Sequence, residues 1–190
     1  SEAICQTLVP GLDILPTTMD LSAAEIELSE LDRREHRLAD ALQGARGHYD
    51  FVLIDCPPSL GLLTVNGLVA ADRAIVPLQC EFYALEGLSQ LVRTINVVKQ
   101  NFNPDLAIQG IVLTMYDSRN KLSDMVSHDV REYFGDLVYQ TVIPRNVRIS
   151  EAPSFGKPVL MYDLKSTGAQ AYAALAAELL SQEKNLKENQ

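Results

Sequence analysis

The chain of 190 residues has three cysteines and no long apolar run. It also lacks the glycine-rich motif of dinucleotide-binding enzymes and the nucleophile motif of serine hydrolases. Without about 18 consecutive apolar residues, it contains no candidate for a membrane-spanning helix. No G-x-G-x-x-G follows a predicted strand, which excludes a Rossmann dehydrogenase. Ser59 lies in Pro-Pro-Ser-Leu-Gly instead of a G-x-S-x-G elbow, which argues against a serine hydrolase. Cys5, Cys56 and Cys80 lack metal-ligand spacing, and their odd number favours a reduced, cytoplasmic setting.

Acidic residues outnumber basic ones, which gives a formal net charge of −9. This balance argues against nucleic-acid binding by the whole surface. The distribution is uneven, because residues 1–50 contain ten acidic and four basic residues, whereas residues 119–165 contain six acidic and seven basic ones. The later region can therefore present a local basic patch; scattered, solvated side chains are the alternative.

The stretch around Asp55 is the most informative part of the sequence. Four consecutive apolar residues, Phe51–Ile54, show no alternation, which is typical of a strand buried on both faces of a parallel sheet. Asp55 follows where this strand would emerge, and Pro57 and Pro58 end it because proline cannot donate to a strand pair. A carboxylate at the carboxyl end of a strand can hold Mg²⁺ directly or through water. The alternative is that Asp55 only caps the next turn.

Strand and helix patterns alternate along the rest of the chain. Short strands are predicted at 11–16, Ala74–Leu78, Ile108–Thr114 and Val138–Ile143. One helix or two are predicted over 23–45, and single helices over 60–71, 85–102, 122–134 and 168–180. A polar tail at 181–190 follows, and we expect it to fray. This alternation predicts an α/β fold with a doubly wound, mostly parallel sheet and helices on both faces. No repeat or linker divides the sequence, so we expect a single domain over residues 1–190.

Five ordered stretches resemble the ParA/Soj family of chromosome and plasmid partitioning ATPases, in the deviant Walker A P-loop group that includes MinD. Each stretch alone is modest, but the ordered set covers most of the chain from Tyr49 onward and is highly specific. The stretches are Tyr49-Asp-Phe-Val-Leu-Ile-Asp-Cys-Pro-Pro-Ser59, Val76-Pro-Leu-Gln-Cys-Glu-Phe-Tyr-Ala-Leu-Glu-Gly-Leu88, Gly110-Ile-Val-Leu-Thr-Met-Tyr-Asp-Ser-Arg119, Val142-Ile-Pro-Arg-Asn-Val-Arg148 and Ser150-Glu-Ala-Pro-Ser-Phe-Gly-Lys-Pro158.

The family's opening segment has no counterpart in these 190 residues. The family begins with a glycine-rich loop that carries two lysines, its first helix and an aspartate-containing switch strand, yet no G-x-x-x-x-G-K-[ST] occurs here. We therefore expect a P-loop NTPase-like fold that lacks the N-terminal P-loop strand and helix, and we interpret the chain as a fragment. A natural protein that lost the loop is the alternative. Because the loop supplies the N–H donors and the lysine that bind phosphates, we expect the 190-residue chain alone to be inactive.

The resemblance implies an ATPase that uses ATP and Mg²⁺. Asp55 matches the Walker B aspartate of the family. In the family, this catalytic residue binds Mg²⁺ through water. Gln79 and Glu81 match a segment near the dimer interface and the nucleotide, with loop packing as the alternative. The residues that match the surroundings of the adenine follow two strand ends, and ordinary loop residues are the alternative for each: Thr114, Met115, Pro144, Arg145 and Asn146.

The resemblance also implies partners. The family binds DNA without sequence preference as an ATP-bound homodimer and is regulated by a ParB-type centromere-binding protein, which implies a cytoplasmic, nucleoid-associated protein with no membrane partner. The DNA-binding candidates are Arg119, Lys121, Arg145 and Arg148, of which Arg145 and Arg148 beside Asn146 are the stronger pair. The alternative function for the whole chain is a non-enzymatic interaction or regulatory module of the same fold that has lost nucleotide hydrolysis.

Overall fold

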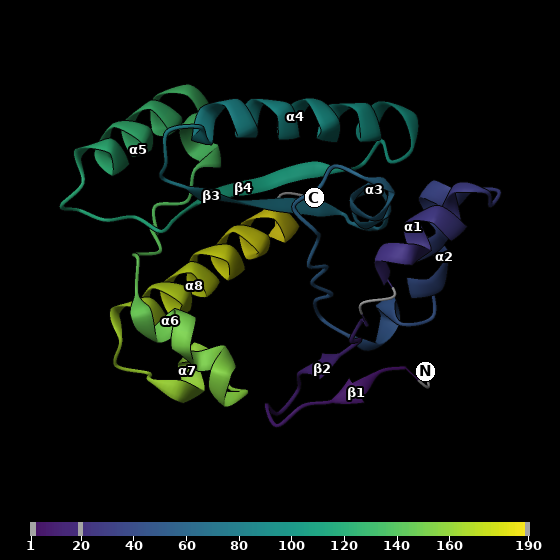
Figure 1. Cartoon of the computed structure of the whole chain (residues 1–190), viewed down its shortest axis with the longest axis horizontal. Helices are drawn as coiled ribbons and strands as arrows, with labels where there is room; N and C mark the ends of the chain where they lie inside the picture. The colour runs from purple at the N-terminus through teal and green to yellow at the C-terminus, as the bar shows by residue number, and fades with distance from the viewer. Residues whose placement is uncertain (1–2, 19–20, 189–190) are drawn as a thin grey trace. The chain divides into compact units, whose positions relative to one another are not determined.

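The computed structural model describes residues 3–18 and 21–188, which form two compact units (Figure 1). The first unit comprises residues 1–73 and 93–107, and the second comprises 74–92 and 108–190. Helix α4 (Ala84–Asn101) contributes its first half to the second unit and its second half to the first. The single domain expected from the sequence stays a prediction.

The first unit consists of a small hairpin followed by short helices. Its elements are β1 (Cys5–Gln6), β2 (Asp13–Ile14), α1 (Leu21–Ser29), η1 (Arg34–His36), α2 (Arg37–Leu42), η2 (Arg46–His48) and α3 (Leu62–Ala70). The two strands pair antiparallel. The helical pattern predicted over 23–45, as one helix or two, forms two α-helices, because Arg33 has a φ of 53°. That left-handed conformation cannot continue an α-helix, so α1 and α2 are separated.

Two amide side chains hold the first unit together. Asn66 of α3 is buried; its Oδ1 accepts the N–H of Leu38 at 3.1 Å, and its Nδ2 donates to the carbonyl oxygen of Arg34 at 2.8 Å. Asn103 donates from Nδ2 to carbonyl oxygens at the end of α3, including that of Ala71 at 2.8 Å. These bonds satisfy backbone groups that the ends of short helices leave unpaired.

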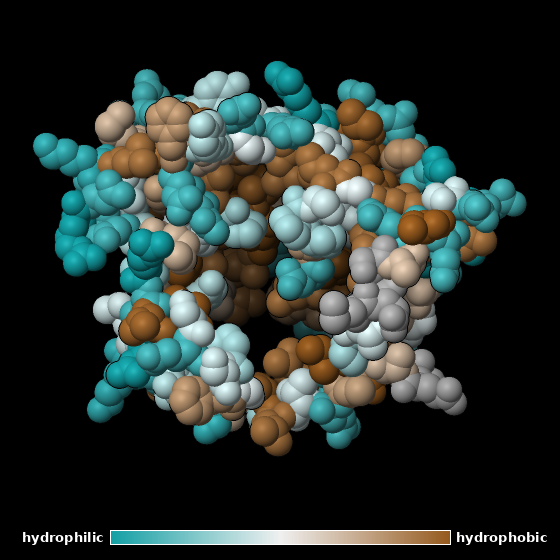
Figure 2. Space-filling view, in the orientation of Figure 1, coloured by the Kyte–Doolittle hydropathy of each residue, from teal (hydrophilic) through white to brown (hydrophobic). Residues whose placement is uncertain are grey.

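The strand predicted at Phe51–Ile54 is absent from the sheet. The segment carries no strand pairing, and its side chains are largely exposed, with Leu53 at 82%. A buried strand needs neighbours that pair its backbone groups, and no described residue pairs with this segment. Figure 2 shows that apolar side chains reach the surface among hydrophilic ones. The prediction that Phe51–Ile54 forms a buried, paired strand was therefore wrong for this structure.

The second unit contains the sheet. Strands β3 (Arg73–Gln79) and β4 (Ala107–Thr114) pair and run parallel, because the N–H of Ala107 bonds Asp72 at their beginnings and the N–H of Cys80 bonds Thr114 at their ends. Both predicted strands are confirmed. Within this unit the first half of α4 and α5 (Lys121–Phe134) lie on one face of the strands, and α8 (Thr167–Glu188) lies on the other (Figure 1). Helices on both faces confirm the predicted α/β architecture.

The predicted strand Val138–Ile143 runs beside β4 but is interrupted. Tyr139 donates its N–H to Ile111 at 3.0 Å, and Ile143 donates to Leu113 at 2.8 Å. The two hydrogen bonds are four residues apart on this segment but only two residues apart on β4. The extra residues of the segment therefore bulge out between the two bonds. The bulged backbone is held by α8, because the carboxylate of Glu178 accepts the N–H groups of residues 140 and 141 at 2.7 and 3.0 Å.

The core of the second unit lies between the strands and α8. Val112, Tyr139 and Ile143 are buried and pack against apolar residues of the following helices, namely Ile149, Ala171, Leu175 and Leu179. The short helices before α8 are η3 (Gly135–Leu137), α6 (Val147–Glu151), η4 (Ala152–Phe155) and α7 (Val159–Tyr162). The fraying predicted from residue 181 was wrong up to Glu188, because α8 continues and Gln182 bonds Gln109 at 3.1 Å; residues 189–190 lie outside the described part of the chain.

Candidate functional site

The carboxyl end of β4 lies beside the segment at 144–146 in the second unit. Tyr116 donates its N–H to Ile143 at 3.2 Å and accepts the N–H of Arg145 at 2.9 Å, and Tyr116 and Pro144 form a parallel bridge. These bonds gather the residues predicted to surround the adenine at one edge of the sheet: Thr114, Met115, Pro144, Arg145 and Asn146. Such an edge is where open α/β sheets bind ligands.

Met115 is conformationally unusual. Its φ of 53° places a long, non-glycine residue in the left-handed region, and its side chain is 38% exposed. Non-glycine residues are rare in this region and gather at functional loops. With Pro144, Met115 offers apolar surface at a sheet edge that also carries backbone hydrogen-bonding groups.

Asp117 and Arg119 form a tight pair just beyond this edge. The Asp117 carboxylate accepts the Arg119 main-chain N–H at 3.0 Å, its Nε at 2.9 Å and its guanidinium NH2 group at 2.8 Å. These hydrogen bonds from Arg119, with the charge of Arg145 as a further cause, lower the pKa of Asp117 to about 2. Asp117 is therefore ionised at any physiological pH.

The other predicted DNA-binding residues differ in how they are held. Arg148 donates to Glu151 at 2.9 Å and lies 3.4 Å from a carboxylate oxygen of Asp163, and the hydrogen bond to Glu151 raises the pKa of Arg148. Lys121 and Arg145 are exposed, and among the described residues neither has a carboxylate within ion-pair distance. The structure thus separates the four candidates into two paired and two unpaired cations.

Two asparagines at this edge cap helices. Asn120 accepts the N–H of Leu122 at 3.0 Å and begins α5, whereas Asn146 accepts the N–H of Arg148 at 2.9 Å and begins α6. Asn146 also donates to Thr167 at 2.8 Å. Helix capping is sufficient to explain why asparagine occupies these two positions, and no ligand is needed for it. The sequence analysis did not predict the short helix α6 that follows Asn146.

Asp55 belongs to the first unit. Its side chain is exposed and has no hydrogen-bond partner among the described residues. Partial burial beside α3 and the neighbouring Asp55 raise the pKa of the Cys56 thiol. No group of three or more acidic, histidine or cysteine side chains within residues 3–18 and 21–188 could hold a metal ion. Asp55 therefore offers one carboxylate, which fits a water-mediated Mg²⁺ contact and not a protein-only metal site.

The dimer-segment candidates Gln79 and Glu81 close the end of β3. Glu81 donates its N–H to the carbonyl oxygen of Gln79 at 2.8 Å, and Ala84 donates to that of Glu81 at 3.0 Å, which leads the chain into α4. Exposed aromatic rings follow, because Phe82 and Tyr83 form an edge-on pair with centroids 5.1 Å apart. Turn geometry alone accounts for the backbone of Gln79 and Glu81.

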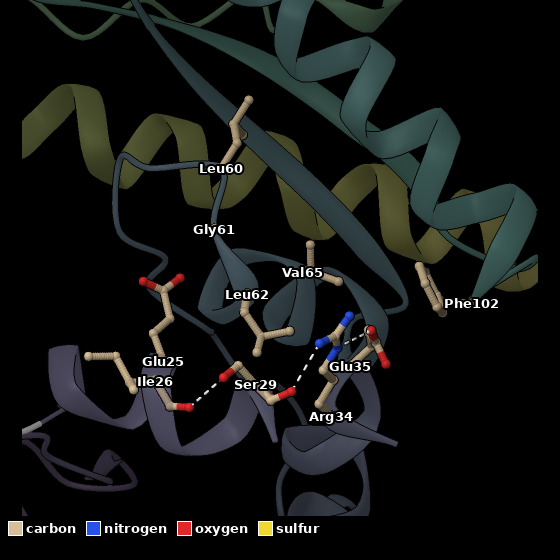
Figure 3. Close-up of a pocket in the computed structure, with 10 residues that line it drawn as sticks. All are labelled: Glu25, Ile26, Ser29, Arg34, Glu35, Leu60, Gly61, Leu62, Val65 and Phe102. Carbon is tan, nitrogen blue, oxygen red and sulfur yellow. Dashed lines mark hydrogen bonds and ion pairs between the residues drawn. The ribbon is translucent and has the colours of Figure 1, made fainter. Parts of the chain in front are cut away.

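The first unit also has an open groove of about 590 Å³ (Figure 3). It lies between α1, η1, the start of α3 and Phe102, and Asp55 does not line it. Arg34 donates to Glu35 at 2.9 Å and to the carbonyl oxygen of Ser29 at 3.0 Å, and these two bonds are drawn in Figure 3. Because Arg34 is already engaged, the groove presents no unpaired cation to a ligand.

Comparisons with known proteins agree on one family. A family model described as an AAA domain matches residues 1–108. The chromosome partitioning protein ParA of Caulobacter vibrioides is 61% identical over 186 residues, which are 97% of this chain and 70% of that protein. The sporulation initiation inhibitor protein Soj of Bacillus subtilis is 53% identical over 178 residues, 94% of this chain and 70% of that protein. The chain belongs to the ParA/Soj family.

A solved structure extends the comparison to the fold. The crystal structure named cobyrinic acid a,c-diamide synthase from Mycobacterium smegmatis, with a bound ATP analog and magnesium, has a TM-score of 0.80 and 42% identity over 96% of this chain and 67% of that chain. The α/β fold of the P-loop nucleotide hydrolases is thereby confirmed for this member of the ParA/Soj family. Within the described residues, no helix combines the length and apolar character needed to cross a membrane.

In this ParA/Soj family member, each unit taken by itself offers part of what a nucleotide needs. In the first unit, Asp55 could contribute a water-mediated metal contact. In the second unit, the sheet edge at 114–116 and 144–146 could contribute apolar surface and backbone groups for a base. A phosphate group needs clustered N–H donors and a cation, and the 190 residues contain no G-x-x-x-x-G-K-[ST]. The residues present therefore do not make a complete nucleotide site.

Proposed function

We propose that the complete protein is an ATP-dependent DNA partitioning ATPase. Support comes from identities of 61% and 53% to ParA and Soj over nearly the whole chain. These identities exceed the 42% to the diamide synthase structure, so partitioning is favoured over amide synthesis. The five stretches that carry the family resemblance include Asp55 and both strand-end segments, which is the observation on which the proposal depends.

In this proposal, ATP and Mg²⁺ are the cofactors of the complete protein: Asp55 would hold Mg²⁺ through water, and the residues of the sheet edge would contact the adenine. The set at that edge is Thr114, Met115, Pro144, Arg145 and Asn146. Asp55 would contribute to catalysis by holding Mg²⁺, which when bound would supply charge stabilisation for phosphoryl transfer. The 190 residues contain no phosphate-binding loop motif, and in this proposal the 190-residue chain alone is inactive.

The proposal includes DNA and protein partners. An ATP-bound homodimer binds DNA without sequence preference through Arg119, Lys121, Arg145 and Arg148, a ParB-type partner regulates it, and the protein works on the nucleoid in the cytoplasm. A dimer joins two weak basic edges, which offsets the repulsion expected from a net charge of −9. The alternative is a regulatory module of the same fold without hydrolysis.

The deciding experiment compares the 190-residue chain with the full-length gene product. We expect the gene upstream of Ser1 to encode a K-G-G-x-G-K-[ST] loop, and we expect calorimetric titration with Mg²⁺–ATP to give binding and turnover only for the full-length protein. Micromolar affinity of the 190-residue chain would contradict the assignment of phosphate binding to the missing loop. A gene without the loop, together with no turnover, would favour the regulatory module.

A further inference from the structure

The loop that follows Asp55 has no backbone hydrogen bonds of its own. Residues 55–60 belong to no helix or strand, and in the described part of the chain none of their backbone groups bonds another backbone group. Pro57 and Pro58 contribute to this, because proline has no N–H to donate. Without other contacts, such a loop would let Asp55 take many positions, and ordering it around a metal would cost conformational entropy.

The hydroxyl of Thr64 ties this loop to helix α3. Thr64 Oγ1 donates to the carbonyl oxygen of Ser59 at 2.5 Å and lies 3.3 Å from that of Pro57. A threonine inside a helix commonly bonds the carbonyl four residues earlier. These two carbonyls lie five and seven residues earlier, before α3 begins. Because Thr64 is 5% exposed, water competes little for the hydroxyl, and the loop is held at two points.

The residues on either side of Asp55 also rest on α3. A β-carbon at position 67, where the helix has glycine, would stand 2.6 Å from Sγ of Cys56 and 3.5 Å from Cγ2 of Ile54. Both flanking side chains therefore turn toward the helix, about one turn beyond Thr64. Asp55 itself is exposed. Its carboxylate is thus directed to solvent while its two neighbours hold the backbone against the helix.

Helix α3 is itself fixed within the first unit. Asn66 joins it to residues 34 and 38, and Asn103 donates to three carbonyl oxygens at its C-terminal end, at 2.8 to 3.2 Å. At its beginning, the N–H of Leu63 donates to the carboxylate of Glu25 at 3.4 Å. A loop that is tied to this helix is therefore held at a defined position in the unit.

We propose that Thr64 is a positioning residue for the Mg²⁺ contact of Asp55, because its hydroxyl holds the loop that begins at this aspartate. The inference rests on the proposed ATPase function and adds a residue that acts through the loop and not by touching metal or nucleotide. A loop that is not held would populate the metal-binding position only part of the time, and apparent affinity falls in proportion to the populated fraction. Thr64 therefore affects how tightly Mg²⁺ is held, and not the transfer step itself.

The experiment uses the full-length gene product and Thr64→Val, which nearly keeps the shape of the side chain and removes the hydroxyl. Calorimetry over a series of Mg²⁺ concentrations measures ATP binding, and turnover is followed over the same series. We expect the half-saturating Mg²⁺ concentration to rise about two- to tenfold, the effect of losing one hydrogen bond that holds the loop. The kcat at saturating Mg²⁺ should stay close to wild type. Thr64→Ser, which keeps the hydroxyl, should restore the wild-type Mg²⁺ dependence.

A second readout needs neither metal nor turnover. Burial beside α3 raises the pKa of the Cys56 thiol, so a released Cys56 is both more accessible and more ionised. We expect iodoacetamide to modify Cys56 about twofold faster or more in Thr64→Val than in wild type, as measured by mass spectrometry of its peptide. Cys80 is 2% exposed and serves as the internal control, whose rate should not change. Equal Cys56 rates in the two proteins would overturn the inference.

The matched control is Val69→Ala, which removes buried volume from the same helix. Position 69 is two residues beyond Gly67, on the other side of the helix. This variant should lower stability and leave the Mg²⁺ dependence and the Cys56 rate at wild-type values. A Thr64→Val protein that loses kcat without a shift in half-saturating Mg²⁺, or that behaves like Val69→Ala, would overturn the inference and leave the proposed ATPase intact. A full-length wild-type protein without Mg²⁺-dependent turnover would overturn both.

Discussion

Gly110 of β4 lies directly against the ring of Tyr139. A β-carbon at position 110 would stand 2.5 Å from Cε2 of that ring, closer than real side-chain contacts allow. Tyr139 is 1% exposed and belongs to the core beneath α8, so the ring has little room to move. Glycine at position 110 is therefore required by packing, because it makes space for the aromatic side chain of the neighbouring segment.

We expect Gly110→Ala to lower the free energy of unfolding by about 1–3 kcal/mol, the usual cost of overpacking a filled core. Gly87→Ala on α4 is the matched control, because a β-carbon there meets no atom within 4 Å. This control should leave stability unchanged or raise it by up to about 1 kcal/mol through better helix propensity. Urea unfolding of the three proteins decides, and equal midpoints for wild type and Gly110→Ala would show that Tyr139 can move aside.

A second prediction concerns the pH dependence of stability through Glu178. Burial acts to raise the pKa of this carboxylate, but the hydrogen bonds from Thr141 and Gln140 and the charge of Arg131 outweigh it, so the pKa is lowered from 4.5. A lowered folded-state pKa gives stability that is present above the unfolded value and lost as the pH falls through the folded value. The contribution of Glu178 is therefore complete above about pH 5 and declines in stronger acid.

We expect Glu178→Gln to cost about 1–2 kcal/mol at neutral pH, because one of two charge-assisted acceptors is lost. The difference from wild type should shrink below the usual glutamate pKa. Glu86→Gln, at an exposed position on α4, is the control and should match wild type throughout. Denaturant unfolding at neutral pH and near pH 3 is the measurement; a difference that does not depend on pH would assign the effect to packing alone.

The sequence predicted elements that local patterns determine and missed those that depend on distant partners. Both β3 and β4 were found: β4 is buried along most of its length, whereas in β3 the buried Val76 and Leu78 alternate with exposed residues. The run at Phe51–Ile54 has the same pattern, but pairing depends on another strand, which a local pattern does not report. The bulge after Tyr139 depends on a carboxylate 38 residues further along the chain, Glu178, and the ion pairs that offset Arg119 and Arg148 were equally invisible as spacing.

A third prediction tests the catalytic assignment of Asp55. In the full-length protein, Asp55→Ala should lower ATP turnover by roughly tenfold or more, since charge stabilisation by a bound metal is worth several kcal/mol. Asp50→Ala, an exposed aspartate at the start of the same segment, should retain wild-type turnover. Raising the Mg²⁺ concentration should partly rescue Asp55→Ala if the metal site is only weakened. Full activity of the Asp55 variant would leave this carboxylate the role of a turn cap.

The last prediction ranks two arginines of the proposed DNA-binding edge. Arg145 has no carboxylate within ion-pair distance among the described residues, whereas Arg148 pairs with Glu151 and Asp163. Because a dimer presents each residue twice, Arg145→Ala with Arg148→Ala should weaken DNA binding strongly and leave ATP-dependent dimerisation intact. Arg145→Ala alone should account for most of the loss, since Arg148 releases fewer counterions. Filter binding across a salt series, with sedimentation to monitor the dimer, is the measurement. Unchanged affinity and slope in the double variant would show that both arginines are solvated loop charges, and would direct attention to Lys121 and Arg119.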